Sequence, residues 1–154
     1  MKVALVLFLV SAAAHAKTEG GELGNAFVPF DSKIGRYSLE YSKDWRVNDL
    51  SQSTSFADTK SVSAAESFLA VTVDGAGART ADELLARLRS THAGTDWQKV
   101  VVGGIGGFTG EENGVRMYYL LRGAGDEVSL RMRSSDGGRS DEILAHMLGS
   151  FRVE

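Results

Sequence analysis

The chain has 154 residues, with 17 Lys and Arg against 20 Asp and Glu, a net charge of −3, and no cysteine. This mild acidic balance argues against general electrostatic attraction to nucleic acid or to anionic lipid, so we expect no nucleic-acid partner. Without cysteine the sequence excludes disulfides, thiolate metal ligands, a cysteine nucleophile and a lipid anchor on an N-terminal cysteine.

The first 16 residues have the pattern of a cleavable signal peptide. Lys2 is followed by an apolar run over residues 3–10 and then by small residues, with Ala14 and Ala16 at the positions that a signal peptidase recognises. The run is shorter than the roughly 20 residues that cross a bilayer, so we expect no membrane span. We predict cleavage after Ala16 and a periplasmic or extracellular protein.

Residues 17–33 are polar and rich in glycine, without sustained periodicity, and we predict a flexible leader there. Residues 34–154 are predicted to form a single domain. Its first strand is indicated by alternation through Tyr37, Leu39 and Tyr41, and a buried strand is predicted over Phe68–Val73, which is rich in β-branched residues.

Two helices are predicted further along the chain. Thr80, with Glu83 three residues later, has the pattern of a capping box, and Ser140 is predicted to cap the final helix. Between them lies a meander that contains the glycine run of residues 103–107 and the turn Asn113-Gly114. The glycine run has no following Lys-Ser/Thr or helix, so it indicates a bend between strands and not a phosphate loop.

Turns between strands outnumber helical crossovers in this order of elements. The predicted fold class is therefore α+β, with one mainly antiparallel sheet packed with helices in a layered sandwich.

The segment from Gly35 to Trp45 resembles the opening of PsbP-like domains, in which a hydrophobic strand and a turn lead to a core Trp. The strand Phe68–Val73, the helix that starts at Thr80, the glycine-broken meander and the terminal helix that leads into Phe151 agree with this, and the resemblance covers residues 33–153. It implies a fold similar to extrinsic photosystem II subunits, to a Ran-binding nuclear import factor and to bacterial envelope proteins such as DcrB. Members of this family are mostly non-enzymatic binding or assembly modules.

The strands predicted over residues 115–121 and 127–133 carry the candidate site. If they pair as a hairpin, Arg116, Arg131 and Arg133 are expected beside Tyr118 on one face. This basic and aromatic patch is a candidate docking surface for an anionic partner, and the alternative is that these arginines are solvated or pair with acids.

Glu142 and His146 are four residues apart, a spacing that could begin a metal site, but no second histidine is near in sequence. We therefore expect no metal, no cofactor and no catalytic residue. His92 is interpreted as a residue at the end of a helix, where the dipole favours a cation.

The leading functional hypothesis is an exported, non-enzymatic binding or assembly module of the bacterial envelope, whose partner is another envelope protein. One alternative is a small-ligand or metal carrier with the ligand between sheet and helix. The other is a small secreted hydrolase, which would need acids or His146 to converge in a pocket.

Overall fold

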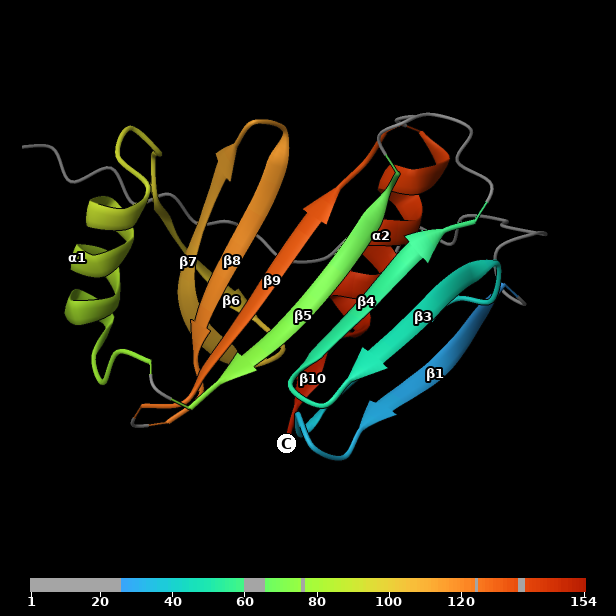
Figure 1. Cartoon of the computed structure of the whole chain (residues 1–154), viewed down its shortest axis with the longest axis horizontal. Coiled ribbons are helices and arrows are strands. Elements are labelled where there is room, and N and C mark those ends of the chain that lie inside the picture. The colour runs from blue at the N-terminus through green and yellow to red at the C-terminus, as the bar shows by residue number, and fades with distance from the viewer. Residues whose placement is uncertain (1–25, 60–65, 76, 124, 136–137) are drawn as a thin grey trace, which may run out of the picture.

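The computed structural model describes residues 26–59, 66–75, 77–123, 125–135 and 138–154. They form two antiparallel sheets and two helices (Figure 1). The larger sheet contains β3 (Trp45–Leu50), β4 (Ser53–Asp58), β5 (Phe68–Asp74), β6 (Gln98–Val102), β7 (Ile105–Glu112), β8 (Val115–Leu121) and β9 (Glu127–Arg133). The smaller sheet contains β1 (Phe27–Ser32), β2 (Tyr37–Ser42) and β10 (Arg152–Val153), and the helices are α1 (Ala81–Thr91) and α2 (Arg139–Ser150).

The seven strands of the larger sheet have the order β3-β4-β5-β9-β8-β7-β6, and every neighbouring pair is antiparallel. The predicted α+β class with a mainly antiparallel sheet is therefore confirmed. The expectation of a single sheet is wrong, because β1, β2 and β10 pair separately.

The prediction of a flexible leader over residues 17–33 is wrong for Phe27–Ser32, which form strand β1. All six residues of β1 pair with β2, and the ring of Phe30 lies edge-on to Phe56 of the larger sheet, with 5.2 Å between ring centroids. This stretch is ordered by partners distant in sequence, so its own pattern, interrupted by Pro29, does not reveal a strand. The predicted signal peptide and residues 17–25 lie outside the described part of the chain.

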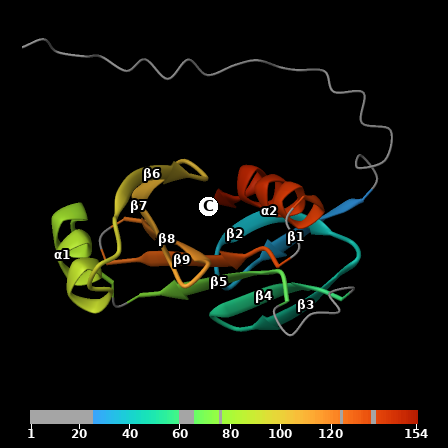
Figure 2. The ribbon, with the colours of Figure 1, turned by 90° about the horizontal axis from the view of Figure 1, so that it is seen from above.

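Different elements pack on the two faces of the larger sheet (Figure 2). Helix α2 and the smaller sheet pack on one face, here called the inner face, and α1 packs on the opposite, outer face over β7 and β8. The inner core includes Trp45, Phe56, Leu120 and Met147, all at most 5% exposed. A smaller outer core joins α1 to the sheet through the following residues: Leu84, Leu88, Trp97, Phe108 and Met117.

Two hairpins close through two-residue turns, and the one at Asn113 and Gly114 is the turn that the sequence predicts. Gly103 and Gly104 connect β6 to β7 with φ of 60° and 87°, and Asn113 and Gly114 connect β7 to β8 with φ of 52° and 74°. Left-handed values at both central positions are those of the tight turn that matches the twist of paired strands, and glycine adopts them without steric cost. Gly103 and Gly104 are thus a bend between strands, whereas Ile105, Gly106 and Gly107 of the same run are the first residues of β7.

The two helix starts differ. The side chain of Thr80 accepts a hydrogen bond from the backbone N–H of Glu83 at 3.2 Å, which confirms the predicted cap. Ser140 is not a cap, because α2 begins at Arg139 and the capping position is occupied by Gly138 at a φ of 46°. Glycine accepts this backbone conformation, so the helix starts before the serine and places Ser140 in its first turn.

Candidate functional site

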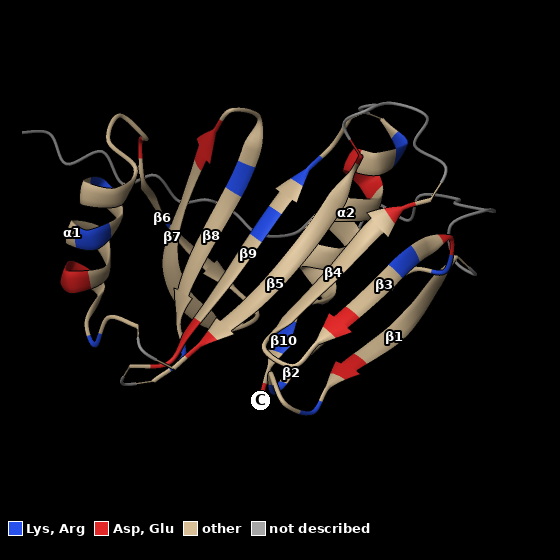
Figure 3. Cartoon of the chain, in the orientation of Figure 1, with Lys and Arg blue, Asp and Glu red and all other residues tan. Residues whose placement is uncertain are grey.

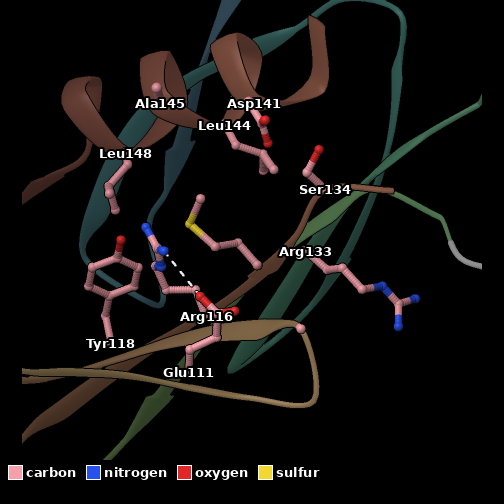
Figure 4. Close-up of a pocket in the computed structure, with 11 residues that line it drawn as sticks. Glu111, Arg116, Tyr118, Arg133, Ser134, Asp141, Leu144, Ala145 and Leu148 are labelled. Atoms are coloured by element: carbon pink, nitrogen blue, oxygen red, sulfur yellow. Dashed lines mark hydrogen bonds and ion pairs between the residues drawn. The ribbon is translucent and has the colours of Figure 1, made fainter. Parts of the chain in front are cut away.

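A cavity of about 450 Å³ lies on the inner face between α2 and the ends of β8 and β9 (Figure 4). Alternation along β8 turns Arg116 and Tyr118 toward α2, and Leu144 and Leu148 of α2 supply the apolar wall opposite. Asp141, in the first turn of α2, points toward the same space. The cavity is therefore mixed in character, with an apolar side and charged groups at its margin.

The charge of Arg116 is already partnered. Its guanidinium lies 3.1 Å from the Glu111 carboxylate, directly across the hairpin in the β7–β8 register. A hydrogen bond to Glu111 is the main cause that raises the pKa of Arg116 above its usual range, and Tyr118 adds to it. Both partners are more than half exposed, so the pair stabilises the protein little and mainly orients the guanidinium.

A second cavity, of about 420 Å³, shares Glu111, Arg116 and Tyr118 with the first and continues toward β6. It is also lined by Asp96 and Gln98. The two cavities together are called the inner groove below. The groove carries three carboxylates, those of Asp96, Glu111 and Asp141, and Arg116 is already paired with one of them.

The structure does not bring the four predicted partner-binding residues together. In the β8–β9 register, Arg116 pairs with Met132 and Tyr118 with Leu130, while Arg131 lies opposite Met117. Arg131 and Arg133 therefore belong to the outer face, and the expectation of one shared face is wrong. Leu121 lies opposite Glu127 across the five-residue connection, so Arg131 shares its face with Met117 and not with Arg116. The expected face would require a register shifted by one residue.

Arg133 shows this separation directly. Its backbone borders the inner groove, but its guanidinium extends away from it in Figure 4. The guanidinium carbon lies 5.3 Å from the centroid of the Phe68 ring, a cation–π contact on the outer face. Figure 3 shows Lys or Arg on β3 and on β9. The strands between them, β4 and β5, are uncharged along most of their length. Arg131 and Arg133 thus lie on a different surface from Arg116 and Tyr118, and the predicted docking patch is divided between the two faces.

Glu142 and His146 do not form the start of a metal site in the described chain. His146 Nε2 lies 2.8 Å from Glu40 Oε2 of β2, and the imidazole stacks on Phe27, with 3.7 Å between centroids. Among the described residues, no group of three or more His, Asp or Glu side chains could hold a metal ion. His146 instead ties α2 to the smaller sheet.

A polar cluster on the outer face was not predicted as a unit. His92, just after α1, places Nδ1 2.9 Å from Glu112 Oε2 and Nε2 3.5 Å from the hydroxyl of Tyr119, and Trp97 packs edge-on against His92. An acid, an imidazole and a hydroxyl in line resemble a nucleophile system. Burial raises the pKa of Tyr119, however, which disfavours the phenolate that attack would require. The cluster fastens the end of α1 to the sheet.

The inner groove could have been found in part from the sequence. The two-residue turn at Asn113 and Gly114 places Glu111 directly opposite Arg116 and Thr109 opposite Tyr118. These two pairs are the middle of the groove. The contribution of α2, including Asp141, depends on packing between segments far apart in the chain and leaves no local signal.

No helix in the described part of the chain is both long and apolar enough to cross a bilayer. No protein-family model matches the sequence, and no curated protein matches it either. Two solved structures are similar. The solution structure of cyanobacterial PsbP (CyanoP) from Synechocystis sp. PCC 6803 aligns over 94% of this chain and 99% of that chain, with a TM-score of 0.57 and 12% identity. A crystal structure from Bacteroides thetaiotaomicron VPI-5482 aligns over 82% of this chain, with a TM-score of 0.52 and 12% identity.

This chain spans about half of the Bacteroides protein, of which 48% is covered. The cyanobacterial structure is covered almost completely, and it is the one whose family the segment from Gly35 to Trp45 resembles. At 12% identity the likeness concerns the fold. The chain has a PsbP-like fold.

Proposed function

We propose that this protein is an exported, non-enzymatic binding or assembly module of the bacterial envelope that contacts another envelope protein through the inner groove. The observation that carries the proposal is the groove itself, an open surface of two adjoining cavities with an apolar wall and charged margins. The PsbP-like fold supports a binding role in place of catalysis.

The charge of the groove indicates the chemistry of the partner. Asp96, Glu111 and Asp141 contribute carboxylates, and Arg116 is compensated by Glu111. A segment with Lys or Arg beside apolar side chains complements this surface better than the anionic partner that the predicted basic patch suggested. Leu144 and Leu148 would receive the apolar side chains.

The groove can be tested by site-specific photo-crosslinking in cells of the source organism. A photoreactive residue at position 148 is expected to capture one envelope protein, whereas the same residue at Ala86, exposed on α1 and distant from the groove, should not. The proposal would be overturned if both positions captured the same proteins or if position 148 captured none.

Charge reversal at two adjacent residues gives a matched control. Asp141→Lys changes a carboxylate that lines the groove, and Glu142→Lys makes the same change one residue later on an exposed side chain outside its lining. We expect the first to reduce crosslinking at position 148 about tenfold and the second to leave it within about twofold. Equal effects would show that only the net charge matters.

Export can be measured separately. The proposal expects the mature protein in the envelope fraction with Lys17 as its first residue, as N-terminal sequencing would report. A protein that retains Met1 and stays in the cytoplasmic fraction would contradict the export component while leaving the groove open to test.

A small-ligand carrier is a second candidate because the cavity under α2 lies between sheet and helix. Its volume of about 450 Å³ falls in the range of small-molecule pockets. Native mass spectrometry of protein purified from its own compartment distinguishes the two functions. A carrier should retain a stoichiometric small mass that Leu148→Trp, which narrows the cavity, displaces.

A further inference from the structure

The larger sheet ends at β6. The edge of β6 that faces away from β7 has no partner strand among the described residues. Figure 2 shows β6 at the margin of the curled sheet. Its sequence, Gln98-Lys99-Val100-Val101-Val102, is rich in β-branched residues, and the side chain of Val101 is 72% exposed. An open edge of this composition is a template for pairing with another strand.

The opposite edge of the sheet is different. Strand β3 ends in an exposed Leu50, but along its length Arg46, Asn48 and Asp49 are exposed, and charged and polar side chains on an edge discourage pairing. On β6, Lys99 is the one charged residue. The contrast indicates that β6 is the edge suited to association.

The backbone of β6 offers a defined set of hydrogen-bonding groups. Val102 and Ile105 close the hairpin across the two-residue turn, so the N–H and C=O groups of Val102 and Val100 point toward β7. Those of Lys99 and Val101 point away from the sheet. They repeat two residues apart, which is the spacing of a hydrogen-bonded antiparallel pair.

We propose that β6 pairs antiparallel with β6 of a second copy of this chain, about a twofold axis at Val100. In this register, Lys99 of one copy lies opposite Val101 of the other, and the outward N–H and C=O groups of each residue meet their complements. The alternative register centred on Lys99 would place two like charges directly opposite each other, which is unfavourable.

The side chains on the outer face agree with this pairing. A cavity of about 550 Å³, lined mostly by apolar groups, extends from Val101 over Gly106 and Phe108 toward Ala81. Gly106 lies directly across from Val101, and nothing would lie within 4 Å of a Cβ there, so the space beside Val101 is open. The methylene groups of Lys99 from the second copy would cover this exposed valine while its ammonium reaches water.

Substitution at position 101 tests both the association and its register. Sedimentation velocity over a range of concentrations should show the wild-type mass rising toward twice that of the monomer. Val101→Lys places a second cation opposite Lys99 and should weaken association about tenfold, whereas Val101→Glu places an anion there and should retain it. Both variants remove the same apolar side chain at an exposed position, so they are matched in folding stability.

Each outcome decides the proposal. A wild-type protein that stays monomeric up to millimolar concentration overturns it, and so does an equal loss of association in both variants, because that result would indicate apolar contact without this register. Association of the wild type and the Glu variant, with dissociation of the Lys variant, supports it. Partner capture at position 148 is a separate measurement at the α2 side of the inner groove, whose other side is lined by Gln98 and Val100 of β6.

Hydrogen exchange provides an independent measurement with a built-in reference. The amide of Val101 should exchange rapidly in dilute protein and become protected at high concentration, while the amide of Val100, bonded within the hairpin, should be protected in both. Concentration-dependent mass without protection at Val101 would place the contact elsewhere and refute the pairing.

Discussion

The carbonyl oxygen of Tyr119 on β8 occupies the space that a β-carbon would need at position 107 of β7. A Cβ built on Gly107 falls well inside van der Waals contact of this oxygen and close to Cα of Leu120. Both obstacles are backbone atoms of a paired strand, so they cannot move aside without breaking the ladder. The close approach explains why this position is a glycine in a strand, where glycine is otherwise unfavourable.

Gly107→Ala is therefore expected to be severely destabilising, with a loss on the order of 4 kcal/mol in the free energy of unfolding or failure to fold. Gly106→Ala is the control, because nothing lies within 4 Å of a Cβ at that position. The control should be neutral or slightly stabilising. Urea denaturation monitored by Trp fluorescence measures both, and equal stabilities would contradict the close approach seen here.

Arg87 and Glu127 form an ion pair that joins α1 to the start of β9. The Glu127 side chain is 5% exposed and that of Arg87 is 46% exposed, so removal of the arginine leaves a buried carboxylate without its cation. We expect Arg87→Met to lower the free energy of unfolding by about 2 kcal/mol.

Arg89→Met is the matched control, since it removes an exposed arginine of the same helix. It should change stability by less than about 0.5 kcal/mol. The double variant Arg87→Met/Glu127→Met should recover part of the loss, because no buried charge remains. A double variant no more stable than Arg87→Met alone would count against this explanation.

Local chemistry was sufficient to predict much of the meander and the start of α1. The strands Val115–Leu121 and Glu127–Arg133 have the predicted bounds, and the turn at Asn113 and Gly114 is where the sequence indicates. These features depend on residues adjacent in the chain, such as an Asn-Gly pair that adopts left-handed backbone values without strain.

The errors arose where partners distant in sequence decide the outcome. The strand at Phe27–Ser32 exists through its pairing with β2, and the face of Arg131 is set by the β8–β9 register, in which it lies opposite Met117. The inner groove combines β7, β8 and α2, and its helical wall has no counterpart in local pattern. Arg116, Arg131 and Arg133 are the same residue type, and they differ in the face of the sheet on which they lie.

The burial of the Tyr119 side chain predicts a loss of stability at alkaline pH. Its burial raises the folded-state pKa above the value of about 10 expected in the unfolded chain. A raised pKa means that the folded state holds the phenol proton more tightly. The corresponding stability is fully present below about pH 10 and is lost as the pH rises through the folded-state pKa.

Tyr119→Phe removes this titration. We expect the difference in the free energy of unfolding between wild type and variant to be constant from about pH 7 to 9 and to shift in favour of the variant above about pH 10. Urea denaturation at each pH measures the difference, and the comparison cancels the titration of lysines common to both proteins. A constant difference through pH 11 would show that burial does not raise the pKa of Tyr119.

Thr80 and Ser140 occupy similar sequence contexts, each followed by acids, but the structure predicts opposite responses to alanine. The Thr80 hydroxyl accepts the Glu83 N–H at 3.2 Å, so Thr80→Ala leaves a helix donor without its protein acceptor and should cost about 1 kcal/mol. Thr80→Ser keeps the acceptor and should retain most of the stability.

Ser140 is 1% exposed, and its hydroxyl has no hydrogen-bond partner among the described atoms. A buried hydroxyl without a partner carries a desolvation cost, so Ser140→Ala should be neutral or stabilising. Thermal unfolding of the two alanine variants provides the comparison. If Ser140→Ala lowered the melting temperature as much as Thr80→Ala, the serine would be acting as the cap that its sequence suggests, and the start of α2 would have to move to it.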